Sequence, residues 1–212
     1  VNGQRYIGGG VGGDIKIVIN GVPGNDLAAF MDGPTIIVNS NAQDGIGDTM
    51  NAGKIIVYGD ARDIVGHSMR GGKIYIRGNV GYRVGIHMKA YRNLYPVIII
   101  GGKAGDFLGE YMAGGLIIIL GLNKQEAEPI VGGYVGTGMH GGMIYIRGRI
   151  EDYQLGKEIR LFGPDQEDRD KLNLYLKEYC QDFSLDFKGI LKEKFIKLIP
   201  YTHRPYGKLY AY

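Results

Sequence analysis

Histidines are the side chains of this chain best suited to bind a metal ion. His67, His87 and His140 lie in three copies of a repeated phrase, and His203 lies near the end of the sequence. Because His67 and His87 belong to adjacent copies, a shared metal is conceivable. No thiol, histidine or acidic residue recurs beside them to complete a set of ligands. We therefore interpret them as corner residues and predict no metal-binding residue.

Acidic and nucleophilic side chains could support acid–base or covalent catalysis. The acidic candidates occupy loop positions in different copies of the phrase: Asp60, Asp63, Asp106 and Glu110. Acidic residues are ordinary in turns. Ser68 and Cys180 lack an evident base and orienting acid, so the pattern indicates no catalytic triad. The sequence therefore predicts no catalytic residue.

Two glycine clusters match the dinucleotide-binding fingerprint. They are Gly8, Gly10 and Gly13, and Gly136, Gly138 and Gly141. Neither cluster opens a helix within a strand–helix–strand unit, as that fingerprint requires. The Gly-Lys pairs at 53–54, 72–73 and 102–103 lack the following Ser or Thr of a P-loop. We interpret the glycines as corners of a repeating β-structure and predict no cofactor-binding residue.

These residues lie in one repeated sequence motif, and its clearest copy runs from Val65 to Gly78. Methionine marks six copies: Met31, Met50, Met69, Met88, Met112 and Met139. An aliphatic residue lies four positions before each methionine, and glycine or alanine lies three before. Once inserted loops are allowed for, isoleucine lies five positions after. The first three intervals are 19 residues and the next two are 24 and 27, with the extra residues near 91–96 and 123–129.

This short period predicts a solenoid, and the strand-forming residues of the phrase make each repeat β-structure. Of the 37 glycines, 33 lie in residues 1–150 and four in 151–212. The sequence accordingly divides into an N-terminal segment with an imperfect first repeat (1–23), about six repeats (24–150) and a C-terminal tail (151–212). In the tail we predict a helix within 165–183, which begins after Pro164, and an extended stretch at 195–200. The tail is expected to cover the C-terminal end or one flank.

An apolar stripe is expected on the outer side of the strands. Its members lie six positions after the methionine, inserted loops aside: Ile37, Ile56, Tyr75, Ile99, Ile118 and Tyr145. Such a stripe exceeds what a monomer normally exposes. We expect the tail helix to cover part of it through Leu172, Leu176 and Tyr179. A partner or a second copy of the chain would cover the rest.

Charge and cysteine content exclude several classes of protein. The net charge of +3 is spread along the chain, which is not the dense basic face of a nucleic-acid-binding protein. Cys180 is the one cysteine, so the chain forms no intrachain disulfide and holds no iron–sulfur cluster by its own thiolates alone. Neither a signal peptide nor an apolar span of about 18–20 residues is present. These features predict a cytoplasmic protein that does not associate with membranes.

The repeat resembles the C-terminal domain of the glutamate synthase large subunit. The resemblance is carried by Gly105 and Asp106, by Glu110-Tyr111-Met112-Ala113-Gly114-Gly115, and by Arg92-Asn93 upstream. Residues 20–30 are similar to that domain's glycine-rich entry, and 195–200 resembles the stretch that closes its chains. The likeness covers about 14–200. The repeats are also similar to the glycine-repeat subunit of formylmethanofuran dehydrogenase, but the tail favours the first relative.

The resemblance implies an all-β fold, a right-handed parallel β-helix with a helical and extended C-terminal tail, and no catalysis by this chain alone. In that family an N-terminal cysteine performs glutamine hydrolysis, and a separate barrel holds FMN and the iron–sulfur cluster. Val1 is not cysteine, so no catalytic residue carries over. We expect a structural subunit in glutamate biosynthesis and nitrogen metabolism. Its partners would be a glutamine amidotransferase and an FMN-dependent synthase, with a homo-oligomer also conceivable. The alternatives are a scaffold of another oxidoreductase, such as formylmethanofuran dehydrogenase, and an independent β-helix enzyme.

Overall fold

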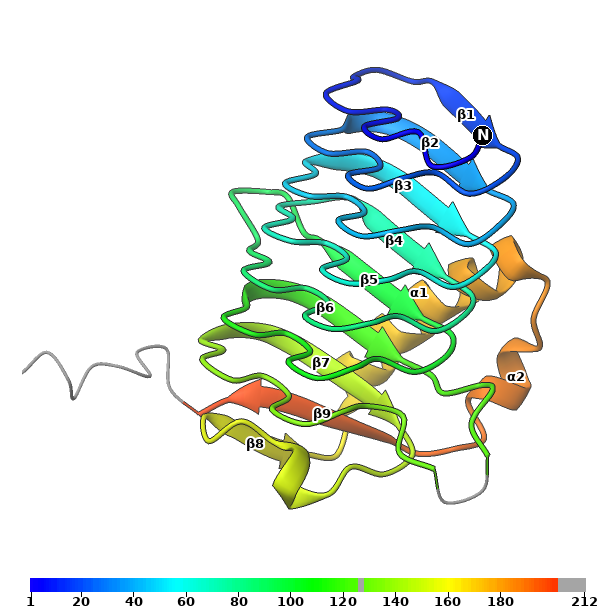
Figure 1. Cartoon of the computed structure of the whole chain (residues 1–212). Helices are drawn as coiled ribbons and strands as arrows, with labels where there is room; N and C mark the ends of the chain where they lie inside the picture. The colour runs from blue at the N-terminus through cyan, green and yellow to red at the C-terminus, as the bar shows by residue number, and fades with distance from the viewer. Residues whose placement is uncertain (126–127, 202–212) are drawn as a thin grey trace, which may run out of the picture.

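The computed structural model describes residues 1–125 and 128–201, which form one nine-stranded sheet. Strands β1 to β7 lie side by side in chain order and are parallel, and the antiparallel strands β9 and β8 complete the sheet (Figure 1). The parallel strands are β1 (Lys16–Ile19), β2 (Asp32–Val38), β3 (Ala52–Val57), β4 (Lys73–Ile76), β5 (Val97–Ile100), β6 (Ala113–Ile119) and β7 (Gly141–Arg147). The remaining elements are the short 3-10 helix η1 (Asp152–Gln154), β8 (Ile159–Phe162), α1 (Gln166–Phe183), α2 (Phe187–Ile190) and β9 (Phe195–Pro200).

The repeat sets the register of the parallel strands. The isoleucines five positions after each methionine pair in sequence, from Ile36 with Ile55 to Ile117 with Ile144. The carbonyls of the first five methionines each accept a hydrogen bond from the next repeat, as Met31 does from the Asn51 amide at 2.9 Å. All six methionine side chains are fully buried. The six methionines, at equivalent positions of successive repeats, therefore form one buried column.

The fold class predicted from the sequence, an all-β right-handed parallel β-helix, is wrong. The finding that overturns it is a single, mostly parallel nine-stranded sheet with helices α1 and α2 beside it, which is an α/β arrangement (Figure 1). The physical reason lies in the strands. The strand in the middle of the sheet, Val97–Ile100, is buried at every position, and a parallel strand of this kind needs a covering layer on both faces.

Helix α1 supplies that layer. A second hydrophobic core joins the outward residues Tyr75, Ile99 and Ile118 to Leu176 and Tyr179 of the helix. The predicted apolar stripe and its cover by α1 are therefore confirmed. The predicted helix start is confirmed as well, because Asp165 caps α1 and accepts from the Asp168 amide at 2.9 Å. Within 1–125 and 128–201, no helix combines the length and apolar character needed to cross a bilayer.

A left-handed backbone recurs at alternate positions of the turn before each methionine. Gly45, Gly47 and Thr49, which lie five, three and one residues before Met50, have φ of 73°, 68° and 53°. The middle position has positive φ in every repeat, including 60° at Ala28 and 70° at Gly85, as the sequence predicts. Both glycine clusters that match the dinucleotide fingerprint belong to these turns. They are followed by strand β1 and by β7, not by a helix.

The buried carboxylate of Asp168 ties α1 to the sheet. Its side chain is 1% exposed and accepts from the Tyr145 hydroxyl at 2.5 Å and the Lys197 ammonium at 2.8 Å. Burial acts to raise the pKa of Asp168, but the hydrogen bonds from Lys197, Tyr145 and the Asp165 backbone outweigh it and hold the pKa below its ordinary value. The start of α1 is thereby fixed against β7 and β9.

Two lysines stacked in register are bridged by one carboxylate of α1. Lys54 and Lys73 pair across β3 and β4, and Glu178 accepts from their ammonium groups at 2.8 and 2.6 Å. Asp182 adds a second contact to Lys54 at 2.5 Å. Burial acts to raise the pKa of Glu178, but the two lysines outweigh it and the pKa lies below its ordinary value. The repulsion between stacked lysines is therefore neutralised by the helix.

We expect Glu178→Gln to lower the free energy of unfolding by about 1–2 kcal/mol at pH 7, because a charge-assisted hydrogen bond is lost to each lysine. The folded-state pKa is lowered, so this stabilisation is present above the unfolded-state pKa and is lost as pH falls through the folded-state value. Urea unfolding at pH 7 and pH 3 measures both effects. A difference between wild type and variant that is equal at the two pH values would contradict the assignment. Lys177→Gln, an exposed change one residue away, is the control.

Candidate functional site

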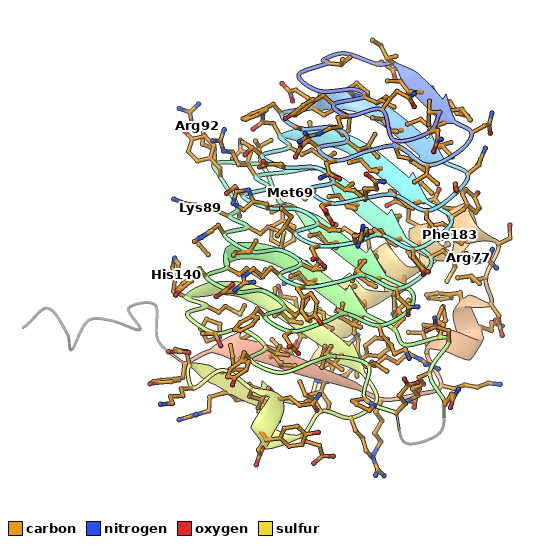
Figure 2. The ribbon with its side chains drawn as sticks, in the orientation of Figure 1. Met69, Arg77, Lys89, Arg92, His140 and Phe183 are labelled. Carbon is orange, nitrogen blue, oxygen red and sulfur yellow. The ribbon has the colours of Figure 1, made fainter. Side chains whose placement is uncertain are left out.

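A basic pocket of about 470 Å³ opens on the edge formed by the turns, and Ser68, Arg70, His87, Lys89 and Tyr91 line it. We call it the basic edge pocket. Figure 2 shows Lys89 and Arg92 projecting from this edge of the stack, whereas Arg77 and Phe183 lie on the opposite side. The pocket is built from equivalent positions of adjacent repeats rather than from one loop.

The buried methionines position its side chains. Ser68 and Arg70 flank Met69, and His87 and Lys89 flank Met88. The two repeats are held together by hydrogen bonds from the Lys89 amide to the Met69 carbonyl at 3.0 Å and from the Ser68 amide to the Ile86 carbonyl at 2.9 Å. With both methionines in the core, the residues on either side of them form the rim of the pocket.

A row of rings and polar groups follows the same edge. The imidazole of His87 stacks on the Tyr111 ring at 5.3 Å and meets the His67 ring edge-on at 6.1 Å. His67 Nδ1 lies 3.0 Å from Asp48 Oδ1, and His67 Nε2 lies 3.4 Å from Ser68 Oγ. The expectation that Ser68 has neither a base nor an orienting acid is therefore wrong. The signal was in the sequence, because Asp48 and His67 both lie two positions before a methionine.

Asp48, His67 and Ser68 are in contact, but the contacts orient the His67 ring rather than activate the Ser68 hydroxyl. A nucleophile and its base normally lie within about 2.6–3.2 Å of each other. The separation of 3.4 Å between Ser68 Oγ and His67 Nε2 is longer. The contact with Asp48 holds the imidazole in one orientation beside Ser68. The turn edge therefore presents polar groups in fixed positions, an arrangement suited to binding.

The acidic candidates named from the sequence have structural roles and do not meet as an acid–base pair. Asp60, Asp63 and Asp106 accept from backbone amides of the next repeat at 2.6, 2.9 and 2.8 Å. Glu110 is buried and forms an ion pair with Arg83 at 2.9 Å. These carboxylates satisfy the donors of the turns.

Cys180 and His140 are not among the residues that line the basic edge pocket. Cys180 is a buried residue of α1, and burial with the nearby Asp186 charge raises its pKa to about 11, so the thiol stays protonated. His140 Nδ1 lies 3.2 Å from the Gly138 carbonyl, and His203 lies outside the described residues. Over the part of the chain that the structure describes, no three His, Cys, Asp or Glu residues are grouped to hold a metal.

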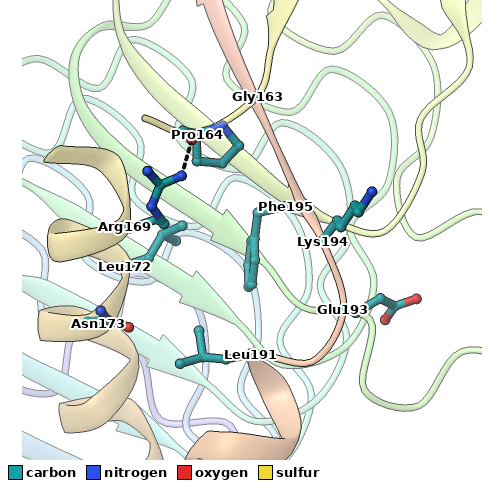
Figure 3. Close-up of a pocket in the computed structure, with 9 residues that line it drawn as sticks. All are labelled: Gly163, Pro164, Arg169, Leu172, Asn173, Leu191, Glu193, Lys194 and Phe195. Atoms are coloured by element: carbon teal, nitrogen blue, oxygen red, sulfur yellow. Dashed lines mark hydrogen bonds between the residues drawn. The ribbon is translucent and has the colours of Figure 1, made fainter. Parts of the chain in front are cut away.

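A second cavity, of about 410 Å³, lies between α1 and the segment that enters β9. Figure 3 shows Leu172, Leu191 and Phe195 facing into it, with Arg169 at its rim. The Arg169 guanidinium donates to the Pro164 carbonyl at 2.8 Å. This cavity therefore offers apolar walls and few polar groups, in contrast to the basic edge pocket.

The fold and the turn pattern define a glycine-repeat protein, and comparison with known sequences assigns its family. A model described as the GXGXG motif matches residues 2–201. The chain therefore belongs to the GXGXG motif family, which is found in the C-terminal region of the glutamate synthase large subunit. The alternating left-handed glycines, such as Gly45 with Gly47, are the structural counterpart of that motif.

A similar protein is known in Methanocaldococcus jannaschii. The uncharacterized protein MJ1350 of that organism is 55% identical over 217 aligned positions. The alignment covers 100% of this chain and 83% of the relative. This similarity supports the family assignment and indicates no function.

Proposed function

We propose that this chain is a scaffold of a glutamate synthase-like complex and catalyses no reaction alone. In this proposal it packs against a glutaminase component and against a synthase component that holds FMN and the iron–sulfur cluster. The observation that carries the proposal is the match of the family model over residues 2–201, nearly the whole chain. The tail that favours the glutamate synthase relative over formylmethanofuran dehydrogenase forms β9, which pairs with β7 as part of the sheet.

Exposed aromatic residues on the turns support the proposal that this edge contacts a partner protein. Phe30 and Tyr134 have left-handed φ of 59° each, and they are 60% and 59% exposed. Glycine would adopt this backbone without strain, whereas a bulky side chain there is an outlier that needs another reason. Tyr6 repeats the situation with φ of 58° and 59% exposure. Aromatic anchors of this kind are typical of protein interfaces.

The left-handed backbone allows a sharp test, because glycine adopts it without strain. We expect Phe30→Gly to keep the melting temperature of the chain, and Tyr134→Gly to lower it slightly because the Tyr134 ring stacks on Phe107 at 5.0 Å. Both changes should weaken association with the glutaminase and synthase polypeptides of the same organism. Co-expression followed by size-exclusion chromatography measures the association, and a flavin spectrum of the co-eluting peak checks its content. Each truncation of an interface aromatic is expected to cost about 2 kcal/mol of binding, or roughly thirty-fold in affinity.

The control is Leu174→Ala, since Leu174 is 64% exposed on α1, away from the turns. The wild-type chain purified alone is expected to be colourless and not to hydrolyse glutamine. Failure of the wild-type chain to co-elute with either polypeptide would refute the proposal. Co-elution that both glycine variants retain would refute only the assigned surface.

A further inference from the structure

Two cations of the basic edge pocket are stacked in register without a carboxylate between them. Arg70 and Lys89 each follow a methionine in adjacent repeats, and the Lys89 amide binds the Met69 carbonyl. Like charges at directly opposed positions of neighbouring strands repel one another. Within residues 1–125 and 128–201, neither side chain has an ion pair or a hydrogen bond to offset that repulsion.

The same chain shows how such a pair is normally satisfied. Lys54 and Lys73 are stacked in register in the same way on the other side of the sheet. There Glu178 bridges them at 2.8 and 2.6 Å. Among the described residues no helix covers the turn edge, so the exposed Arg70 and Lys89 are open to an anion from solution (Figure 1).

The basic edge pocket offers donors of several kinds, whereas the Glu178 bridge involves ammonium groups alone. Glu178 is satisfied by two ammonium groups, one on each oxygen. The basic edge pocket adds the Ser68 hydroxyl and the His87 imidazole to the Arg70 and Lys89 side chains. A phosphate group presents three free oxygens in a tetrahedral arrangement, and guanidinium binds two of them at once. A guanidinium beside an ammonium group and a hydroxyl is therefore a set of donors suited to a phosphate.

An aromatic wall completes the pocket. Tyr91 lines it, and the Arg92 guanidinium lies 5.1 Å from the centre of the Tyr91 ring. The volume of about 470 Å³ exceeds the needs of an inorganic ion and accommodates a small organic molecule. We propose that the basic edge pocket binds a small phosphorylated ligand, with its phosphate between Arg70 and Lys89 and its organic part against Tyr91. This inference does not depend on the proposed scaffold role.

Isothermal titration calorimetry of the full chain with phenyl phosphate, inorganic phosphate and benzoate tests the proposal. Phenyl phosphate carries both a phosphate and a ring, whereas inorganic phosphate lacks the ring and benzoate has a carboxylate in place of the phosphate. We expect phenyl phosphate to bind at one site, with at least ten-fold higher affinity than either of the other probes. Arg70→Ala and Lys89→Ala should each weaken it ten-fold or more, and Arg70→Lys should weaken it less than Arg70→Ala.

The matched control is Arg62→Ala, which removes an exposed cation outside the pocket and should leave the affinity unchanged. Circular dichroism melting curves confirm that each variant is folded, as expected for exposed side chains. Benzoate binding as tightly as phenyl phosphate would overturn the assignment to phosphate. Absence of saturable binding at millimolar phenyl phosphate, or binding that survives in both alanine variants, would overturn the site.

Discussion

Gly85→Val is expected to lower the free energy of unfolding by about 2–6 kcal/mol, the sum of backbone strain and overpacking of a filled core. Gly85 has φ of 70°, and a Cβ at this position would lie 2.5 Å from Cδ1 of Ile117. Ile117 is fully buried in β6, so it cannot move aside without disturbing its neighbours. The second methyl group of valine adds to the clash and disfavours the left-handed conformation further.

Two further variants separate strain from overpacking. Gly163→Val is the control, because no atom lies within 4 Å of a Cβ built on Gly163 and its φ is ordinary. Gly85→Ala should fall between the two, since Ala28 occupies the equivalent position with φ of 60°. Thermal and urea unfolding of the three variants measure the effect. A stability of Gly85→Val equal to that of Gly163→Val would show that the turn relaxes freely.

The stacking of the repeats could be predicted from the sequence because one period fixes every register. Once the methionines are aligned, Ile36, Ile55 and Ile74 must be neighbours, and the structure pairs them so. The helix could be placed as well, because Leu172, Leu176 and Tyr179 lie at helical spacing and the strands expose a matching stripe.

The fold class could not be predicted in the same way, because the C-terminal segment carries no repeat. Whether 151–201 forms a separate tail or part of the sheet depends on contacts such as Lys197 with Asp168 and the antiparallel pairing of β9 with β7. Nothing local in the sequence of β9 specifies its partner strand. Regarding the segment as an appendage led to the wrong class, although its helix and its extended stretch were predicted correctly.

The same distinction applies to the site. Residues at equivalent repeat positions, such as Arg70 and Lys89, can be recognised as neighbours by aligning the copies of the repeat. The bridge from Lys54 to Glu178 joins residues 124 positions apart and depends on how α1 docks. Recognising Arg70 and Lys89 as unneutralised therefore required the structure, because only the structure shows which stacked cations a carboxylate reaches.

Leu176→Ala is the second change with a large expected effect, about 2–5 kcal/mol of unfolding free energy, as for other large-to-small changes in a core. Leu176 is fully buried among residues of α1 and the outer face of the sheet. Removing it leaves a cavity between the helix and the strands and loosens the cover over Ile99 and Ile118. An uncovered aliphatic stripe of that kind favours self-association.

Leu174→Ala is the matched control, because Leu174 lies on the same helix and is 64% exposed. Its change should stay within about 0.5 kcal/mol. Urea unfolding gives the stability of both variants, and light scattering at increasing concentration reports association. If Leu176→Ala were as stable as Leu174→Ala, α1 would not be needed as a second layer of the core. If Leu176→Ala were destabilised without associating, the helix would remain docked through the anchors at Asp168 and Glu178 and keep the stripe covered.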